Sequence, residues 1–333
     1  MIFILPIYEL FWQYILNFDR KILYFLWKYK KRKFLKNLEI INLDKSSLKL
    51  VEGDKDFLNI SNKINNEIDN SLSEKIDSKF LEHKNKGIGY NVTTSGEASY
   101  KIDILDLLSE DLQKEIFKLS VSDKMIYTVT NYLKVFPILA KVTVYQNFPT
   151  PELKQRGAML WHKDDFGYKS LDLFLNISFV DHNNGPLHAI KKNNPLGVFS
   201  KSTHEIKNPK TGERGKLENE LINENENKEK IAILLGQGNA FLIDSFRVYH
   251  RGGHCKNRNR VMLRFSYQTG DSMRIKDSEE NFSYIKSISI EKINSYFIKK
   301  LLFYKSGKLN KFIKKRLINF YRLIHYKQSD FFG

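Results

Sequence analysis

The stretch Ala158-Met-Leu-Trp-His-Lys-Asp164 decides the fold, because it sets two candidate metal ligands two residues apart at the end of an apolar run. In a β-strand the side chains i and i+2 leave the same face, so His162 and Asp164 can bind one ion while Lys163 points away. A third candidate ligand, His250, ends a later apolar run. Two imidazoles and one carboxylate can hold one face of an octahedral ferrous ion and leave the opposite face open.

Short strand patterns follow one another from Ala140 onward. These runs are rich in β-branched and aromatic residues and alternate in polarity, as half-buried strands do. Turn signals such as Asn183-Asn-Gly-Pro186 and Arg251-Gly-Gly253 separate them. Many short strands with such turns are typical of a sandwich or barrel, so we expect a mainly β fold with flanking helices. The predicted strands cover residues 141–146, 158–163, 171–180, 186–190, 231–235, 240–243 and 260–268.

Helical patterns lie outside these strands. Ser109 precedes Glu110, Asp111 and an apolar-periodic run, which is the pattern of a capped helix N-terminus. The polar stretch 43–86 predicts a short helix or two and a linker. Longer helices are predicted over residues 8–34, 109–119, 122–135 and 295–326.

The two ends of the chain combine Lys and Arg with aromatic and aliphatic residues at helical spacing. The first lacks the basic start and small-residue cleavage site of a secretory signal, and Glu9, Gln13 and Asp19 interrupt it within the length of a membrane span. Basic amphipathic helices can lie on an anionic membrane as a peripheral contact. They can equally pack on the core with their lysines in water, and both interpretations are open.

The net charge of +17 favours acidic partners such as phosphates, anionic lipids or nucleic acid. Much of this charge is Lys mixed with Asn and Ile, so an AT-rich genome explains it equally well. The chain carries no helix-turn-helix, RNA-binding or zinc-finger signature, and we expect no nucleic-acid partner. Its single cysteine, Cys255, allows no disulfide within the chain, which suits a reducing cytosol and predicts a cytoplasmic protein.

The motifs around the candidate ligands occur in a fixed order. A strand after Asp164 leads to Asn184-Gly-Pro-Leu187, His250 precedes Gly252-Gly253, and Arg260 begins the last strand. This arrangement resembles the Fe(II)- and 2-oxoglutarate-dependent dioxygenases, most closely their phytanoyl-CoA dioxygenase-like branch. The resemblance covers roughly residues 141–268, and both ends of the chain fall outside it.

The resemblance implies a double-stranded β-helix, or jelly-roll, core of the cupin type. It implies that His162, Asp164 and His250 bind Fe(II). It also implies that Arg260 pairs with the far carboxylate of 2-oxoglutarate, a task that suits the planar fork of an arginine. The expected reaction consumes O₂, releases succinate and CO₂, and hydroxylates an unactivated C–H bond of a small-molecule or lipid-like substrate.

Two details of the resemblance are open. His254 and Arg264 have the same ten-residue separation as His250 and Arg260, although the Gly252-Gly253 turn favours the earlier pair. The family also has a lysine on the strand before the first ligands, and that position falls near Gln146 or Asn147 here. After Leu187 the chain departs from the family's usual turn, so the substrate class cannot be transferred.

We therefore expect three parts. Residues 1–86 form a basic, aromatic helix and a polar linker, residues 87–275 form the oxygenase domain with a polar insertion at about 202–230, and residues 276–333 form a basic amphipathic tail. One rival function is a cupin-like isomerase or hydrolase that uses its metal as a Lewis acid. Arg260 argues against this, because such an enzyme needs no carboxylate clamp. Another rival is a non-catalytic membrane-associated binding protein.

Overall fold

The computed structural model of the chain describes residues 17–36, 47–85, 100–149, 169–190, 230–270 and 295–302, with positions 14, 38, 41–43, 159, 161–162 and 164. The predicted insertion lies outside the described residues except for Lys230. The predicted tail is described only at residues 295–302, and the predicted strand 158–163 only at three positions. The three-part division of the chain stays a prediction.

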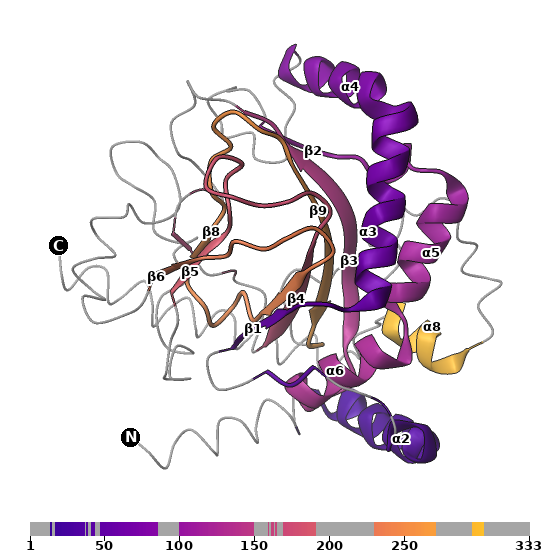
Figure 1. Ribbon diagram of the computed structural model, residues 1–333. Coiled ribbons are helices and arrows are strands. Elements are labelled where there is room, and N and C mark those ends of the chain that lie inside the picture. The colour runs from indigo at the N-terminus through magenta and orange to yellow at the C-terminus, as the bar shows by residue number, and fades with distance from the viewer. Residues whose placement is uncertain are drawn as a thin grey trace.

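Two antiparallel sheets form the centre of the fold (Figure 1). The larger has the order β1-β7-β4-β9-β3-β2, so its two latest strands are inserted among earlier ones. The smaller has the order β6-β5-β8 and faces the larger across the interior. The strands are β1 (Leu48–Val51), β2 (Lys101–Asp103), β3 (Ile138–Asn147), β4 (Ser170–Asn176), β5 (His188–Ile190), β6 (Lys230–Ala232), β7 (Ala240–Ile243), β8 (His250–Arg251) and β9 (Arg260–Gln268).

Some predicted strands agree with the observed bounds and others do not. The predictions 240–243 and 260–268 match the bounds of β7 and β9, whereas β4 ends at Asn176 rather than at residue 180. Strands β1, β2 and β8 were not predicted. β1 lies within the polar stretch 43–86, which also contains two helices joined by a π-helical turn.

Helices cover the outer face of the larger sheet (Figure 1). Side chains of α3, α5 and α6 form one apolar core with those of β3, β4 and β9, as the buried Phe57, Ile116 and Val129 illustrate. In the described residues no helix has both the length and the hydropathy of a membrane span. The helices are α2 (Phe18–Leu35), α3 (Lys55–Glu67), α4 (Ser73–Asn85), α5 (Glu110–Ser120), α6 (Asp123–Leu133) and α8 (Tyr296–Leu302).

The predicted helices 109–119 and 122–135 are confirmed as α5 and α6, but they begin differently. Ser122 caps α6 by accepting a hydrogen bond from the Met125 amide at 3.3 Å. Ser109 stands at the same position before α5 but makes no such bond. Its hydroxyl bonds to Glu67 at 2.8 Å instead and ties α5 to the end of α3.

Strand β9 separates the apolar core from the interior between the sheets. Its residues alternate, and Leu263 and Phe265 pack with the helices. Met262 instead joins a second cluster that includes residues of the smaller sheet. Arg260 and Arg264 have the same strand parity as Met262, so both arginines face the interior.

Two glycines allow the loops beside β5 and β8 to meet backbone to backbone. Gly185 has a φ of +69°, and a Cβ built on it would lie 2.6 Å from the carbonyl oxygen of Gly253. A Cβ on Gly253 would in turn collide with the Pro186 carbonyl. The contact continues as a β-bridge between Asn184 and Cys255. It fixes the loop that leaves β8 against the loop that enters β5.

We predict that Gly185→Ala lowers the free energy of unfolding by about 3 kcal/mol, because it combines left-handed strain with overpacking. Gly53→Ala is the matched control. Gly53 has a φ of +71° but nothing within 4 Å of a built Cβ, so we expect only about 1 kcal/mol there. Urea denaturation measures both. Equal losses in the two variants would contradict the close approach of the loops.

Candidate metal centre

The two candidate histidine ligands face each other across a short antiparallel bridge. The amide of His162 donates to the carbonyl of His250 at 2.9 Å, and the amide of His250 donates back at 2.9 Å. Residues directly opposite in such a pair project from the same face. Their ring centroids are accordingly 4.4 Å apart.

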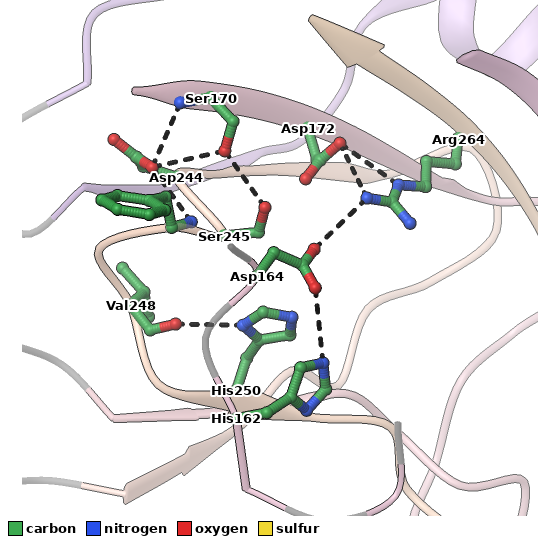
Figure 2. Close-up of polar contacts among 10 residues, drawn as sticks. His162, Asp164, Ser170, Asp172, Asp244, Ser245, Val248, His250 and Arg264 are labelled. Carbon is green, nitrogen blue, oxygen red and sulfur yellow. Dashed lines mark hydrogen bonds and ion pairs between the residues drawn. The ribbon is translucent and has the colours of Figure 1, made fainter. Parts of the chain in front are cut away.

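Asp164 completes this cluster two residues further along. Its amide donates to the carbonyl of Ser245 at 2.9 Å, which continues the pairing begun at His162. One carboxylate oxygen lies 3.7 Å from His162 Nε2. One ligand atom from each of His162, Asp164 and His250 lies within 4.8 Å of the others, and Figure 2 shows the three side chains converging. All three residues are buried, with exposed fractions of 4%, 7% and 6%.

The ring of His250 is held in one orientation by a contact at Nδ1, the nitrogen on the side away from the candidate metal position. Its Nδ1 lies 3.0 Å from the carbonyl oxygen of Val248 (Figure 2). A carbonyl only accepts hydrogen bonds, so the proton sits on Nδ1 and the lone pair of Nε2 stays available. Metal-binding histidines are commonly held in this way. The donor set therefore fits a transition metal: two imidazole nitrogens and one carboxylate, buried on one side of an interior space.

The turn before His250 is held by Asp244, a residue that sequence reasoning did not single out. Its carboxylate is fully buried and accepts hydrogen bonds from the Tyr132 hydroxyl at 2.7 Å and the Phe246 amide at 3.2 Å. Burial raises the pKa of Asp244, while the nearby Arg247 opposes the shift. These contacts fix the segment that supplies the Ser245 carbonyl to Asp164.

Arg264 orients the carboxylate of Asp164 from the other side. Its Nη2 lies 3.6 Å from Asp164 and 3.0 Å from Asp172, and its Nε donates to Asp172 at 3.2 Å (Figure 2). Burial of Arg264 favours loss of its proton, but Asp172 and Asp164 together hold its pKa above the ordinary value. The guanidinium is thus already engaged by two carboxylates.

Arg260 has a different environment on the same face of β9. Only 3% of it is exposed, and its Nε and Nη1 have no hydrogen-bond partner in the described part of the chain. The two candidate arginines therefore have different surroundings. Arg264 forms an ion pair with Asp172. The Nε and Nη1 of Arg260 are buried and have no hydrogen-bond partner among the described residues. His250 rather than His254 joins the metal cluster.

Lys101 is a second cation near Arg260 that the sequence did not identify. Asn147 pairs with Lys101 on one side and with Arg260 on the other, so the three residues form one row across the sheet. The Lys101 ammonium lies 4.5 Å from the ring centre of Tyr145. Burial, followed by Arg264 and Arg260, lowers the pKa of Lys101 to about 8. Gln146 and Asn147 on β3 are neutral amides, and the positive charge of this row comes from Lys101 on β2.

We predict that His162→Ala and His250→Ala weaken Fe(II) binding more than about a hundredfold, since each removes one of three candidate ligands. His254→Ala is the matched control and should bind Fe(II) like the parent. Anaerobic isothermal titration gives the affinities, and circular dichroism checks folding. Loss of binding in His254→Ala with normal binding in His250→Ala would move the centre to the other histidine.

No family model matches the chain, and no curated protein matches its sequence. Solved structures are similar to it at low identity. AviO1 from Streptomyces viridochromogenes Tue57 is 13% identical, with a TM-score of 0.38 over 68% of this chain and 96% of AviO1. EctD from S. alaskensis, solved with 2-oxoglutarate and 5-hydroxyectoine, is 13% identical, with a TM-score of 0.40 over 68% of this chain and 73% of EctD.

The non-haem alpha-ketoglutarate-dependent epimerase SnoN from nogalamycin biosynthesis is 14% identical. That match has a TM-score of 0.34 and covers 52% of this chain and 61% of SnoN. At such identities and TM-scores, these likenesses do not assign a reaction or a substrate to this chain.

Proposed function

We propose that this chain is an Fe(II)- and 2-oxoglutarate-dependent oxygenase of the phytanoyl-CoA dioxygenase-like kind. Its two sheets would be the halves of a double-stranded β-helix. It would hydroxylate an unactivated C–H bond of a small-molecule or lipid-like substrate. In this proposal His162, Asp164 and His250 hold the iron, and Arg260 holds the far carboxylate of 2-oxoglutarate.

The observation that carries this proposal is the buried Nε and Nη1 of Arg260, which find no hydrogen-bond partner among the described residues, on the face shared with Arg264. A buried charge without a partner is costly, so its position implies an anionic ligand. Arg264 lies four residues away along β9, about 13 Å, and contacts the candidate ligand Asp164. An anion at Arg260 would therefore lie further along β9 than the metal, where the far end of a bound diacid would be held.

Lys101 supports the same assignment, because it adds a second cation to the row of Arg260. An arginine and a lysine together can neutralise a carboxylate and satisfy its lone pairs. A Lewis-acid isomerase or hydrolase would have no use for this pair so far from its metal. The two side chains thus favour a co-substrate that carries a second acidic group.

The iron with 2-oxoglutarate and O₂ supplies the oxidising chemistry when bound, with release of succinate and CO₂. The chain's own residues would bind the iron and 2-oxoglutarate and hold the ligand side chains in orientation. The Val248 carbonyl keeps a proton on His250 Nδ1, and Arg264 keeps one oxygen of Asp164 turned away from the histidines. Buried Tyr145 and Phe174 line the space between the sheets and exclude water. A ferrous centre and a single buried cysteine suit a reducing compartment, and we propose the cytoplasm.

The proposal predicts a weak visible charge-transfer band when Fe(II) and 2-oxoglutarate are added without oxygen. His250→Ala should lose the band. Arg260→Met should require roughly thirtyfold more 2-oxoglutarate, since removing one partner of a buried charge pair costs about 2 kcal/mol or more. Arg258→Met is the matched control, because Arg258 is an exposed arginine two residues earlier that pairs with Asp181.

Titration of the band with 2-oxoglutarate measures all of these variants. A folded, iron-loaded protein that gives no band would exclude the oxygenase. Equal behaviour of Arg260→Met and Arg258→Met would exclude the assigned clamp while leaving the metal centre in place.

Lys101 predicts a pH dependence of the affinity for 2-oxoglutarate. The anion binds the protonated lysine, whose pKa is lowered to about 8, so the affinity should be highest below pH 8 and fall as the pH rises above it. The total loss should be roughly tenfold, because a hydrogen bond to a charged group is worth about 1.5 kcal/mol. Lys101→Arg keeps its charge and should remove this fall. A fall that persists in Lys101→Arg would assign the titration to another group.

A further inference from the structure

Helix α2 is apolar on two opposite sides. The inner side packs into the core through Leu23, Tyr24, Trp27 and Leu35. A surface helix usually shows polar residues on its other side. Here the other side exposes five large apolar residues, with exposed fractions in parentheses: Phe18 (58%), Ile22 (44%), Phe25 (54%), Leu26 (51%) and Tyr29 (68%).

These exposed residues form one stripe rather than scattered positions. Residues 18, 22, 25 and 29 are separated by four, three and four positions, which places them along one face of an α-helix. In Figure 1, α2 lies at the edge of the molecule beneath α6, and no described element covers its outer side. A contiguous apolar surface with a polar rim marks an interaction site.

The rim of this stripe is strongly basic. Exposed cations follow the stripe toward the end of the helix, and Asp19 is the one acid within α2. The guanidinium of Arg32 lies 4.7 Å from the ring centre of Tyr29. The exposed cations of this region are Lys28, Lys30, Arg32, Lys33 and Lys36.

Helix α8, far along the chain, lies against the flank of α2. Its Lys300 carbonyl accepts a hydrogen bond from Arg20 at 2.5 Å, and Lys30 lies 5.7 Å from the ring centre of Phe297. Lys299 and Lys300 are exposed beside α2, as is Tyr296 at 54%. Arg20 is buried, so α8 packs against the inner side of α2, and its exposed lysines adjoin the basic rim beside Lys30.

We propose that the outer face of α2, together with the adjoining lysines of α8, docks on an anionic lipid membrane. Its aromatic and aliphatic side chains would enter the interface, and its lysines and arginines would lie at the level of the headgroups. A second copy of the chain is a poorer occupant, because pairing this face with itself would bring like charges together. The proposal is independent of the reaction at the metal centre.

Vesicle flotation of the full chain tests this docking. The probes are vesicles of phosphatidylcholine alone and of phosphatidylcholine mixed with phosphatidylserine. One variant, Phe25→Ser/Tyr29→Ser, removes apolar contacts, and another, Lys28→Glu/Lys33→Glu, reverses two charges. Matched controls on other surfaces are Leu81→Ser/Phe179→Ser, also exposed apolar residues, and Lys75→Glu/Lys118→Glu, also exposed lysines.

We expect binding to the anionic vesicles that weakens with salt, with at least about a tenfold loss in both α2 variants and none in the controls. All four variants change exposed side chains, and circular dichroism checks that they fold. Absence of binding, equal binding to both kinds of vesicle, or full binding by the α2 variants would overturn the proposal. A dimer that only Phe25→Ser/Tyr29→Ser dissociates, without vesicle binding, would assign the face to a second copy and also overturn it.

Discussion

The backbone pairing of His162 with His250 is the constraint on which the candidate site depends. It joins a short segment before β4 to β8, and two hydrogen bonds of 2.9 Å fix its register. Side chains in a strand alternate, so a slip of one residue would turn either histidine out of the interior. The bridge is short, and its position is set by neighbours: Asp164 bonds to the Ser245 carbonyl, and β8 pairs with β5. The ligand geometry is therefore a property of several weakly paired segments acting together.

The two faces of strand β9 have different roles in the larger sheet. One set of alternate residues completes the apolar core beneath the helices, and the other set presents arginines to the interior. The same backbone that is stabilised by burial on one side thus holds charged groups in place on the other. This explains how the interior can keep several cations close together. Burial also lowers the pKa values of Lys101 on β2 and Lys141 on β3, to about 8 and about 7, beside these arginines.

The sequence allowed the candidate pair His162 and Asp164 and the longest strands to be predicted, because both are local patterns. An H-x-D pair needs only the two-residue period of a strand, and β9 is long enough to show that period. Strands β1, β2 and β8 have four, three and two residues, too few for a period to be recognised. Lys101 was missed for the same reason, since its place beside Arg260 depends on the register of β2 against β3. The difference between Arg260 and Arg264 likewise became visible only when Asp172 was placed.

The contact of Gly185 with Gly253 has an evolutionary consequence. No side chain lies between the two loops at this point, so neither position can accept a larger residue without moving the other loop. Side chains of the cluster between the sheets can be exchanged for others of similar volume, because neighbouring side chains can adjust to them. The glycine pair cannot drift in this way. Homologues that had diverged in specificity would therefore be expected to share these two glycines as a coupled pair, even where little else of the interior was retained.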